Sequence, residues 1–250
     1  MKCLIINGSP RKGFTWKAVQ RVKEQMLAMG EVEFEELMLA EADIPMCKGC
    51  FICFNQGEDK CPHASRVQPI VQKIQQADAL IITSPVYSLN VSGLIKNFFD
   101  HTSYLYHRPR MFDKKALVIA STAGSAAAKT ANYMRDTLKH WGFNRVYTIA
   151  LTVMGNTQLT PKMQAKCDAT AKTFFKDVES KKIYPPTWKR VMFYNMWRSL
   201  CQLPSGLPAD KEYWSQSQQK NSQYGPQVPI GPAKRLFGKM LGGLFGKMVQ

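Results

Sequence analysis

The sequence predicts an α/β fold: a doubly wound sheet of five parallel strands, followed by a C-terminal helical extension. The first supporting observation is that short apolar runs alternate along the chain with segments of helical spacing, as in parallel sheets whose strands are connected by helices. The second is that loops rich in small and polar residues follow the first, third and fourth runs. These loops would lie at the carboxyl ends of the strands, where doubly wound folds bind their ligands.

The first strand and the loop after it form the most informative stretch of the chain. The apolar run at residues 3–6 leads directly into a loop at residues 7–13, and helical spacing begins after that loop. Such a loop gathers free backbone N–H groups and the positive end of the helix dipole. We therefore expect it to bind one terminal phosphate, the alternative being an ordinary turn. The residues expected at this phosphate site are Ser9, Arg11, Gly13, Thr15 and Trp16.

The remaining elements follow in order along the chain. Apolar or alternating runs predict further strands at residues 31–37, 79–83, 115–121 and 146–151. Helical spacing predicts helices at residues 67–77, from about residue 92, and at residues 126–141 and 161–178. The last of these begins at Pro161, where a missing N–H costs little.

Two separated motifs give the chain a family resemblance. The first is Gly8-Ser9-Pro10-Arg11; the second is Ser84-Pro85-Val86-Tyr87, followed by Ser92-Gly93-Leu94 and Lys96-Asn97-Phe98-Phe99-Asp100. Over about residues 1–180 they resemble the FMN-phosphate loop and the flavin-ring loop of the NADPH-dependent FMN reductase branch of the flavodoxin-like superfamily. The sequence departs from the family pattern at Phe14, where Asn is common, and at His101, where Arg usually follows the Asp.

The resemblance implies a flavodoxin-like fold that binds FMN and uses NADPH or NADH as reductant. FMN is expected rather than FAD, because one compact loop offers a site for one phosphate group. Pro85, Val86 and Tyr87 would lie against the flavin ring. The loop with Thr122, Ala123 and Gly124 is small enough for its backbone to approach the pyrimidine edge. The flavin itself carries hydride chemistry, so no catalytic side chain is assigned.

A cysteine-rich loop at residues 46–62 is the second feature that indicates chemistry. Cys47, Cys50 and Cys53 repeat with two residues between them, and Cys61 follows. Three thiolates at this spacing can wrap one cluster, and a fourth ligand completes a tetrahedral set. This loop resembles that of the iron–sulfur flavoproteins, which carry a [4Fe–4S] cluster there. Four cysteines also suit a tetrahedral zinc ion, and a third alternative is that the thiols are free or form a disulfide.

Composition limits the remaining possibilities. The chain has 250 residues, 45% of them hydrophobic, and no apolar run is long enough to span a bilayer. The N-terminal run is too short for a signal peptide, so a cytoplasmic location is expected and the seven cysteines favour metal or redox chemistry over disulfides. The net charge of +16 predicts acidic partners. No nucleic-acid motif accompanies it, so nucleic acid is not expected among them.

The extension is expected to differ from the rest of the chain. Residues 1–182 are predicted to form the FMN-binding domain and residues 183–250 a basic extension; residues 181–250 carry 11 Lys and Arg against two acids. A short helix is expected at residues 187–200, a loop-rich stretch at residues 204–232, and an amphipathic helix at residues 233–249. The broad apolar face of that last helix would consist of Leu236, Phe237, Met240, Leu241, Leu244, Phe245, Met248 and Val249. Its cover would be a second subunit, the chain's own core or an anionic membrane surface, which makes peripheral membrane contact one alternative.

These observations favour an FMN-dependent NAD(P)H oxidoreductase that passes electrons to a quinone, another small molecule or a protein, in a homodimer. Without nicotinamide turnover the chain would be an electron-carrier flavoprotein, but such carriers tend to be acidic. A third possibility is a membrane-associated module that kept the fold and lost the flavin. His101 and His107, beyond the ring-loop helix, are expected to be packing or surface residues.

Overall fold

A sheet of five parallel strands forms the centre of the molecule, in the order β2-β1-β3-β4-β5. The computed structural model describes residues 1–220 and 222–248. The strands are β1 (Lys2–Asn7), β2 (Glu33–Met38), β3 (Ala79–Pro85), β4 (Lys115–Thr122) and β5 (Arg145–Thr152). The predicted fold class and all five predicted strands are confirmed, because each run of the sequence forms a strand at its expected place.

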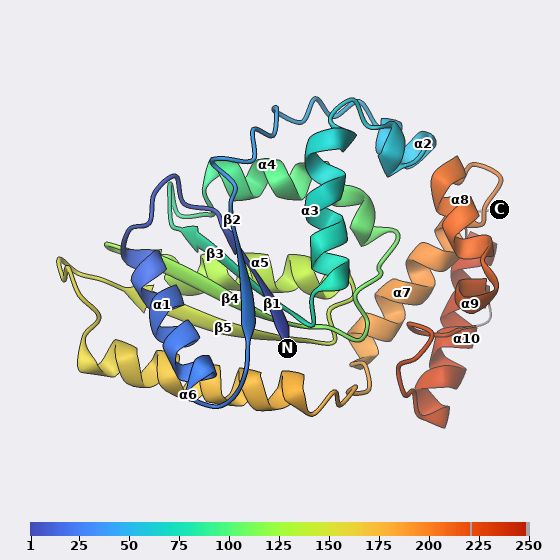
Figure 1. The fold of residues 1–250 in the computed structure, drawn as a ribbon. Helices are drawn as coiled ribbons and strands as arrows, with labels where there is room; N and C mark the ends of the chain where they lie inside the picture. Colours follow the sequence, from blue (N-terminus) through green and yellow to red (C-terminus); the bar gives the residue numbers. More distant parts are fainter. Residues whose placement is uncertain (221, 249–250) are drawn as a thin grey trace.

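Helices cover both faces of the sheet (Figure 1). Helices α1 (Phe14–Leu27) and α6 (Pro161–Glu179) lie on one face, and α3 (Ala64–Gln76), α4 (Gly93–His101) and α5 (Ala127–His140) on the other. Strand β1 supplies both cores: Cys3 and Ile5 pack with α1 and α6, whereas Leu4 and Ile6 pack on the opposite side. Full burial of an aliphatic side chain of this size contributes about 1.5–3 kcal/mol. Because both faces of β1 are buried, the strand needs apolar residues at consecutive positions.

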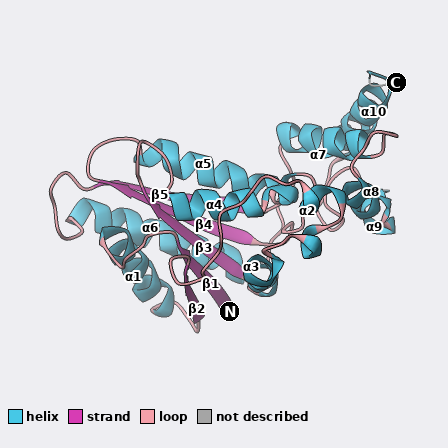
Figure 2. Cartoon of the chain, turned by 90° about the horizontal axis from the view of Figure 1, so that it is seen from above, coloured by secondary structure: helices cyan, strands magenta, loops and turns pink. Residues whose placement is uncertain are grey.

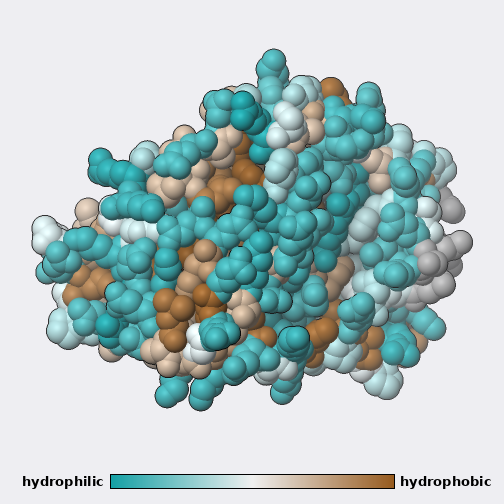
Figure 3. Space-filling view, in the orientation of Figure 1, coloured by the Kyte–Doolittle hydropathy of each residue, from teal (hydrophilic) through white to brown (hydrophobic). Residues whose placement is uncertain are grey.

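The strand order reverses at β1, which has β2 on one side and β3 on the other. The loops after β1, β3 and β4 all lie at the carboxyl edge of the sheet, at the left in Figure 1. The C-terminal helices lie at the right, beyond the amino ends of the strands, and Figure 2 shows the same separation from above. Hydrophilic residues cover most of the face drawn in Figure 3.

The C-terminal extension has an apolar cluster of its own. Helix α7 (Trp188–Cys201) confirms the expected short helix. The expectation of a loop-rich stretch after it is wrong in part, because α8 (Pro208–Ser215) and α9 (Ser217–Lys220) form there. The reason is that Tyr213 and the fully buried Trp214 pack with Tyr194, Tyr224 and Phe112, and this aromatic packing outweighs a Pro-, Ser- and Gln-rich composition.

The last helix, α10 (Pro232–Met248), packs against α7, but through its glycines and only part of the expected apolar face. Gly238 is buried on α7, where an added Cβ would lie 2.8 Å from Nδ2 of Asn195, and Phe237 meets Trp188 edge to face. Leu236, Met240 and Leu244 remain 61%, 66% and 53% exposed. A glycine lets two helix backbones approach closely, so the glycine side of α10 forms much of the contact.

The expected contributions of Phe245, Met248 and Val249 lie outside the described side chains. No helix in the described part of the chain is both long enough and apolar enough to cross a membrane.

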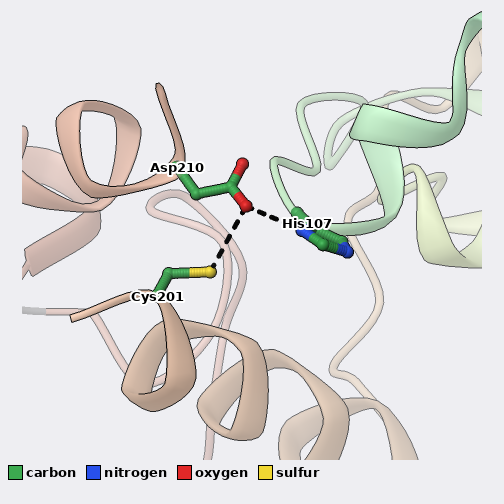
Figure 4. A group of neighbouring side chains, drawn as sticks. All are labelled: His107, Cys201 and Asp210. Atoms are coloured by element: carbon green, nitrogen blue, oxygen red, sulfur yellow. Dashed lines mark hydrogen bonds and ion pairs between the residues drawn. The ribbon is translucent and has the colours of Figure 1, made fainter. Parts of the chain in front are cut away.

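Buried charges join the extension to the core (Figure 4). The carboxylate of Asp210, on α8, is completely buried. One of its oxygens, Oδ2, lies 2.7 Å from Nδ1 of His107, and the other, Oδ1, lies 3.4 Å from Nη1 of Arg108. The thiol of Cys201, at the end of α7, lies 3.7 Å from Oδ2. Since His107 and Arg108 belong to the core, this carboxylate ties the extension to it.

Arg108 also contacts the cysteine-rich loop. Its Nη2 donates a hydrogen bond of 2.6 Å to the carbonyl of Cys53 and lies 3.3 Å from Oε2 of Glu58. The guanidinium is almost completely buried, so these contacts replace its hydration. One side chain therefore connects the core, the cysteine-rich loop and the extension.

Candidate functional site

The loop after β1 is held by a small network of buried polar groups. The side-chain oxygen of Asn7 accepts hydrogen bonds from the backbone N–H of Ser9 at 3.1 Å and from the hydroxyl of Thr83 at 2.8 Å. The N–H of Gly8 donates to the carbonyl of Thr83, and the hydroxyl of Ser92 donates to the carbonyl of Gly8. The loop is thereby fixed to β3 and to the start of α4.

Gly8 has no room for a side chain. An added Cβ would lie 2.1 Å from Cγ1 of Ile95 and 2.7 Å from the backbone oxygen of Thr83. The second atom belongs to the sheet and cannot move aside. Only glycine therefore lets α4 start this close to the loop.

The N-terminus of α1 is left open for an anion. Its N-cap is Gly13, which offers no side-chain cap, and the N–H groups of Phe14 and Thr15 have no acceptor among the described residues. The hydroxyl of Ser9 accepts a bond from the N–H of Arg11, so its own hydrogen is free to donate. The Arg11 side chain is exposed. Unpaired N–H groups at a helix start are an anion-binding arrangement.

Thr15 and Trp16 are positioned differently from the other residues of the predicted phosphate site. The hydroxyl of Thr15 is buried and lies 2.6 Å from that of Ser121 on β4. The ring of Trp16 is part of the core between α1 and α6, with the ammonium of Lys12 4.5 Å from its centroid. The hydroxyl of Thr15 thus links the first loop to β4, and the ring of Trp16 packs in the core on the side of the sheet that carries α1 and α6.

The predicted ring loop follows β3 as a tight turn. The N–H of Val86 donates to the carbonyl of Ser121, which ties this loop to the end of β4. Tyr87 and Asn90 exchange backbone hydrogen bonds around the turn, and the Tyr87 side chain is 46% exposed. The turn therefore presents an aromatic ring at the carboxyl edge.

The third loop follows β4 beside the other two. Ala123 and Gly124 are exposed, and the N–H of Gly124 donates to the hydroxyl of Thr122 at 3.2 Å. The loop after β5 also reaches this region, because the N–H of Met154 donates to the carbonyl of Ala123, and the Met154 side chain is 78% exposed. Met154 was not singled out in the sequence, where no motif marks it. The structure thus brings all three predicted loops to one edge.

The cysteine-rich loop crosses to the far end of α4. It contains two short helical turns, α2 (Ile52–Asn55) and η1 (Glu58–Lys60). The four cysteines line a cavity of about 300 Å³, together with aromatic rings and two histidines. Those two histidines are His63 and His101, whose rings meet edge to face with centroids 5.5 Å apart. The predicted cysteine set is therefore brought together around one cavity.

Two residues of α4 hold this loop. The side-chain oxygen of Asn97 accepts from the N–H of Cys47 at 2.9 Å, and its Nδ2 donates to the carbonyls of Ile44 and Pro45. Nε2 of His101 lies 2.8 Å from the carbonyl of Pro45, so it carries the proton in the neutral ring. The other nitrogen, Nδ1, then faces Sγ of Cys61 at 4.0 Å. His101 is buried, as expected of a packing residue, and it also lies beside the thiols.

Sequence reasoning could have found this pair. Asn97 and His101 are four residues apart on one helix, so they share a face. That they face the loop depends on a contact between distant parts of the chain.

The four thiols are spread around the cavity. Among the described residues, no three of their sulfurs lie within 4.8 Å of one another. A tetrahedral zinc ion, with Zn–S bonds of about 2.3 Å, would hold its sulfurs about 3.8 Å apart, so the cysteine side chains would have to turn inward to bind it. Burial, with the neighbouring Cys61, raises the pKa of the Cys53 thiol to about 11, so a cationic group would be needed to keep it as a thiolate.

A second group of side chains of the types that bind metals belongs instead to the ion pairs between the core and the extension. His107, Cys201 and Asp210 form the one group of three such side chains within 4.8 Å in the described part of the chain. Burial, and then the Asp210 carboxylate, raise the pKa of the Cys201 thiol above its usual range. A protonated thiol and the fixed guanidinium of Arg108 both oppose a bound cation, so we assign this group a structural role.

Comparison with known proteins identifies the family. The sequence model of the NADPH-dependent FMN reductases matches residues 1–158, which include all three loops and all four cysteines. The chain belongs to the NADPH-dependent FMN reductase family. The matched residues include the open N-terminus of α1.

Relatives of this family member include iron–sulfur flavoproteins. One from Archaeoglobus fulgidus is 33% identical over 144 residues, covering 57% of this chain and 64% of the relative. A second from the same organism is matched over 49% of its length. The match thus spans 64% and 49% of the lengths of these two relatives. An iron–sulfur flavoprotein from Clostridioides difficile is 26% identical over 75% of this chain and 83% of its own length.

Solved structures share the fold. The NAD(P)H:quinone oxidoreductase from Methanothermobacter marburgensis aligns with a TM-score of 0.56 and 21% identity, covering 72% of this chain and 97% of that one. An azoreductase from Bacillus anthracis aligns with a TM-score of 0.53 and 15% identity, covering 72% and 99%. At these identities the likeness concerns the flavodoxin-like fold alone.

Proposed function

We propose that the protein is an FMN-dependent NAD(P)H oxidoreductase. The observation that carries this proposal is the open N-terminus of α1 beside two further loops at the carboxyl edge, in a chain of the NADPH-dependent FMN reductase family. When bound, the flavin accepts hydride from NAD(P)H and passes electrons to an acceptor. The acceptor class would be a quinone, another small molecule or a protein.

Each loop would contact one part of the FMN. The N–H groups of Phe14 and Thr15, the hydroxyl of Ser9 and the guanidinium of Arg11 would donate to the phosphate, with Gly13 leaving the approach open. The turn after β3 would orient the ring, and the backbone of the exposed loop after β4 would meet its pyrimidine edge. The residues proposed for the ring are Pro85, Val86, Tyr87, Thr122, Ala123 and Gly124.

We also propose that Cys47, Cys50, Cys53 and Cys61 hold a [4Fe–4S] cluster. The supporting observations are their common cavity and the iron–sulfur flavoproteins among the relatives of the chain. The N-cap of α4 is Ser92, beside the phosphate loop, and His101 at its other end borders the cavity. A helix of nine residues spans about 14 Å. A cluster there would give the flavin a route for single electrons.

The outward side of α10 suggests a membrane contact. Leu236, Met240 and Leu244 recur every four residues along one exposed side, and the exposed Arg235 and Lys239 flank them. Helix α10 has no acidic residue, and residues 181–250 carry 11 Lys and Arg against two acids. Each basic residue near an anionic bilayer contributes about 1 kcal/mol. We propose that this side lies on an anionic membrane surface.

Replacement of Arg11 by Ala tests the phosphate site. Loss of a charge-assisted donor should weaken FMN binding by about 1.5–3 kcal/mol, a rise of about 10- to 150-fold in Kd. The measurement is fluorescence titration of apoprotein with FMN. Arg66→Ala, at another exposed arginine, on α3, serves as the matched control and should bind like the wild type. An unchanged Kd for Arg11→Ala contradicts the assignment.

Anaerobic reduction tests the activity itself. Addition of NADPH or NADH to FMN-loaded protein should bleach the flavin absorbance band, because efficient transfer needs the nicotinamide close over the exposed ring. Steady oxidation with an added quinone should follow. Bleaching by dithionite but by neither nicotinamide would replace this proposal with an electron-carrier function.

Metal analysis of anaerobically purified protein tests the cysteine set. Iron and sulfide should each approach about four per chain, as a [4Fe–4S] cluster requires. Cys53→Ser should lose the iron, whereas Cys167→Ala, at a buried thiol of α6 outside the cavity, should keep it. Zinc without iron, or iron-free protein with four titratable thiols, would rule the cluster out.

Vesicle sedimentation tests the membrane contact. Full-length protein should sediment with vesicles that contain phosphatidylserine, and serine substitutions of Leu236, Met240 and Leu244 together should weaken this at least tenfold. Leu27→Ser, at an apolar residue of α1 that is 52% exposed, is the control. Equal, negligible sedimentation of all forms contradicts the proposal.

The same variants also test the homodimer expected from the family resemblance, which stays a prediction. Sedimentation velocity without vesicles measures the mass of the wild type. A mass halved by the triple substitution would assign this side of α10 to a second copy of the chain and overturn the membrane proposal.

A further inference from the structure

A second cavity lies at the opposite end of the sheet from the three loops. It has a volume of about 800 Å³ and opens between α7 and the end of α5 with the start of β5. Figures 1 and 2 show these elements at the junction of the core with the extension. None of the residues proposed to contact FMN lines it. The cavity therefore belongs to neither of the sites described above.

Aromatic rings form part of its wall. Tyr106 and His140 are stacked, with centroids 4.9 Å apart and planes 20° apart, and Phe193 meets His140 edge to face at 5.3 Å. Trp197 is a further lining residue. All four side chains are partly exposed, so their rings are accessible from the cavity. Such walls favour a flat ring, which can stack or meet them edge to face.

Positive charge is concentrated in the same cavity. Its lining contains five cationic side chains and one acidic side chain, Asp136. Arg135 and Lys139 both lie near that carboxylate. The other three cations, Arg145, Lys189 and Arg190, have no carboxylate partner within the described part of the chain.

Arg190 contributes to the shape of the cavity as well as to its charge. It donates to the carbonyls of Gly142, Phe143 and Asn144, whereas its buried Nε has no partner among the described residues. The residue thus fixes the loop between α5 and β5 against α7, and its own position is fixed in turn.

The pKa values of Lys139 and His140, two lining residues, are both lowered, in agreement with this excess of positive charge. Burial lowers the pKa of Lys139, and the charge of Arg135 lowers it further, against the opposite effect of Asp136. Burial likewise lowers the pKa of His140, where Lys189 and Arg190 add to the effect and Asp136 opposes it. A bound anion would relieve this repulsion.

We propose that the cavity is a binding site for a planar aromatic anion, a compound with a flat ring and a carboxylate, sulfonate or phosphate group. The ring would lie against Phe193 and His140. The anionic group would face Lys139, Lys189 and Arg145. Neither feature alone suffices, because an exposed anion is well hydrated and a neutral ring leaves the cations unpaired.

Aromatic side chains connect the cavity to the cysteine-rich loop. Trp197 stacks on His107 with centroids 3.9 Å apart, and His107 in turn contacts Phe54 of that loop at 4.8 Å. A ligand beside Trp197 therefore touches a continuous row of rings that begins at the cysteine cavity.

Calorimetric titration of the full-length, FMN-loaded protein with naphthalene-2-sulfonate tests the proposal. FMN loading keeps the probe out of the flavin site. Saturable binding of one probe per chain is expected. Two matched probes should each bind at least tenfold more weakly: naphthalene-2-methanol, which has the ring without the charge, and methanesulfonate, which has the charge without the ring.

Variants then locate the binding. Lys189→Glu changes an exposed residue of α7 and Phe193→Ala removes one ring; each should raise the Kd of naphthalene-2-sulfonate at least tenfold. Lys172→Glu, an exposed residue of α6 outside the lining, should leave it unchanged. Thermal unfolding verifies that each variant is folded. The proposal is overturned if no saturable binding occurs, or if Lys189→Glu binds the probe as tightly as the wild type does.

Discussion

The buried guanidinium of Arg108 is the interaction on which the arrangement of this molecule depends. It donates to the carbonyl of Cys53, lies near Glu58 and pairs with Asp210, and so contacts the cysteine-rich loop and the extension together. Removal of one partner from a buried ion pair typically costs about 3–5 kcal/mol, because an uncompensated charge is left behind. That is a large share of the roughly 5–15 kcal/mol by which folded proteins are stable. The loop and the extension are therefore not independent additions to the sheet.

The same chain keeps the two proposed sites apart. At the carboxyl edge the loops are fixed by backbone contacts that require Gly8 and by the side chain of Asn7. At the other end of α4 the cysteine cavity is fixed by the side chains of Asn97 and His101. Helix α4 contacts the phosphate loop at its start and the cysteine-rich loop at its end. The length of this helix therefore sets the distance between the two sites.

Local pattern was sufficient to predict the sheet, because each strand is a run of apolar residues or, for β2, of alternating acidic and apolar residues, and the three ligand loops follow strands at the same edge. It was also sufficient for the cysteine set, since three of its members are neighbours in sequence. The face of α10 was not predictable in this way: by hydrophobicity alone Leu236 and Met240 should be covered, but Gly238 allows the closest approach to Asn195. The roles of His101 and Arg108 likewise depend on contacts between residues about 40 and 100 positions apart. Such contacts leave no local signature in a sequence.

The matched family region ends at residue 158, so the joint between Arg108 and Asp210 connects a family position to one outside it. A chain that lost the extension would leave Arg108 with Glu58 as its one carboxylate partner among the described residues, and would expose the peptide carbonyl of His107 that now accepts from Trp214. The stability of the core and that of the extension are therefore coupled through these contacts.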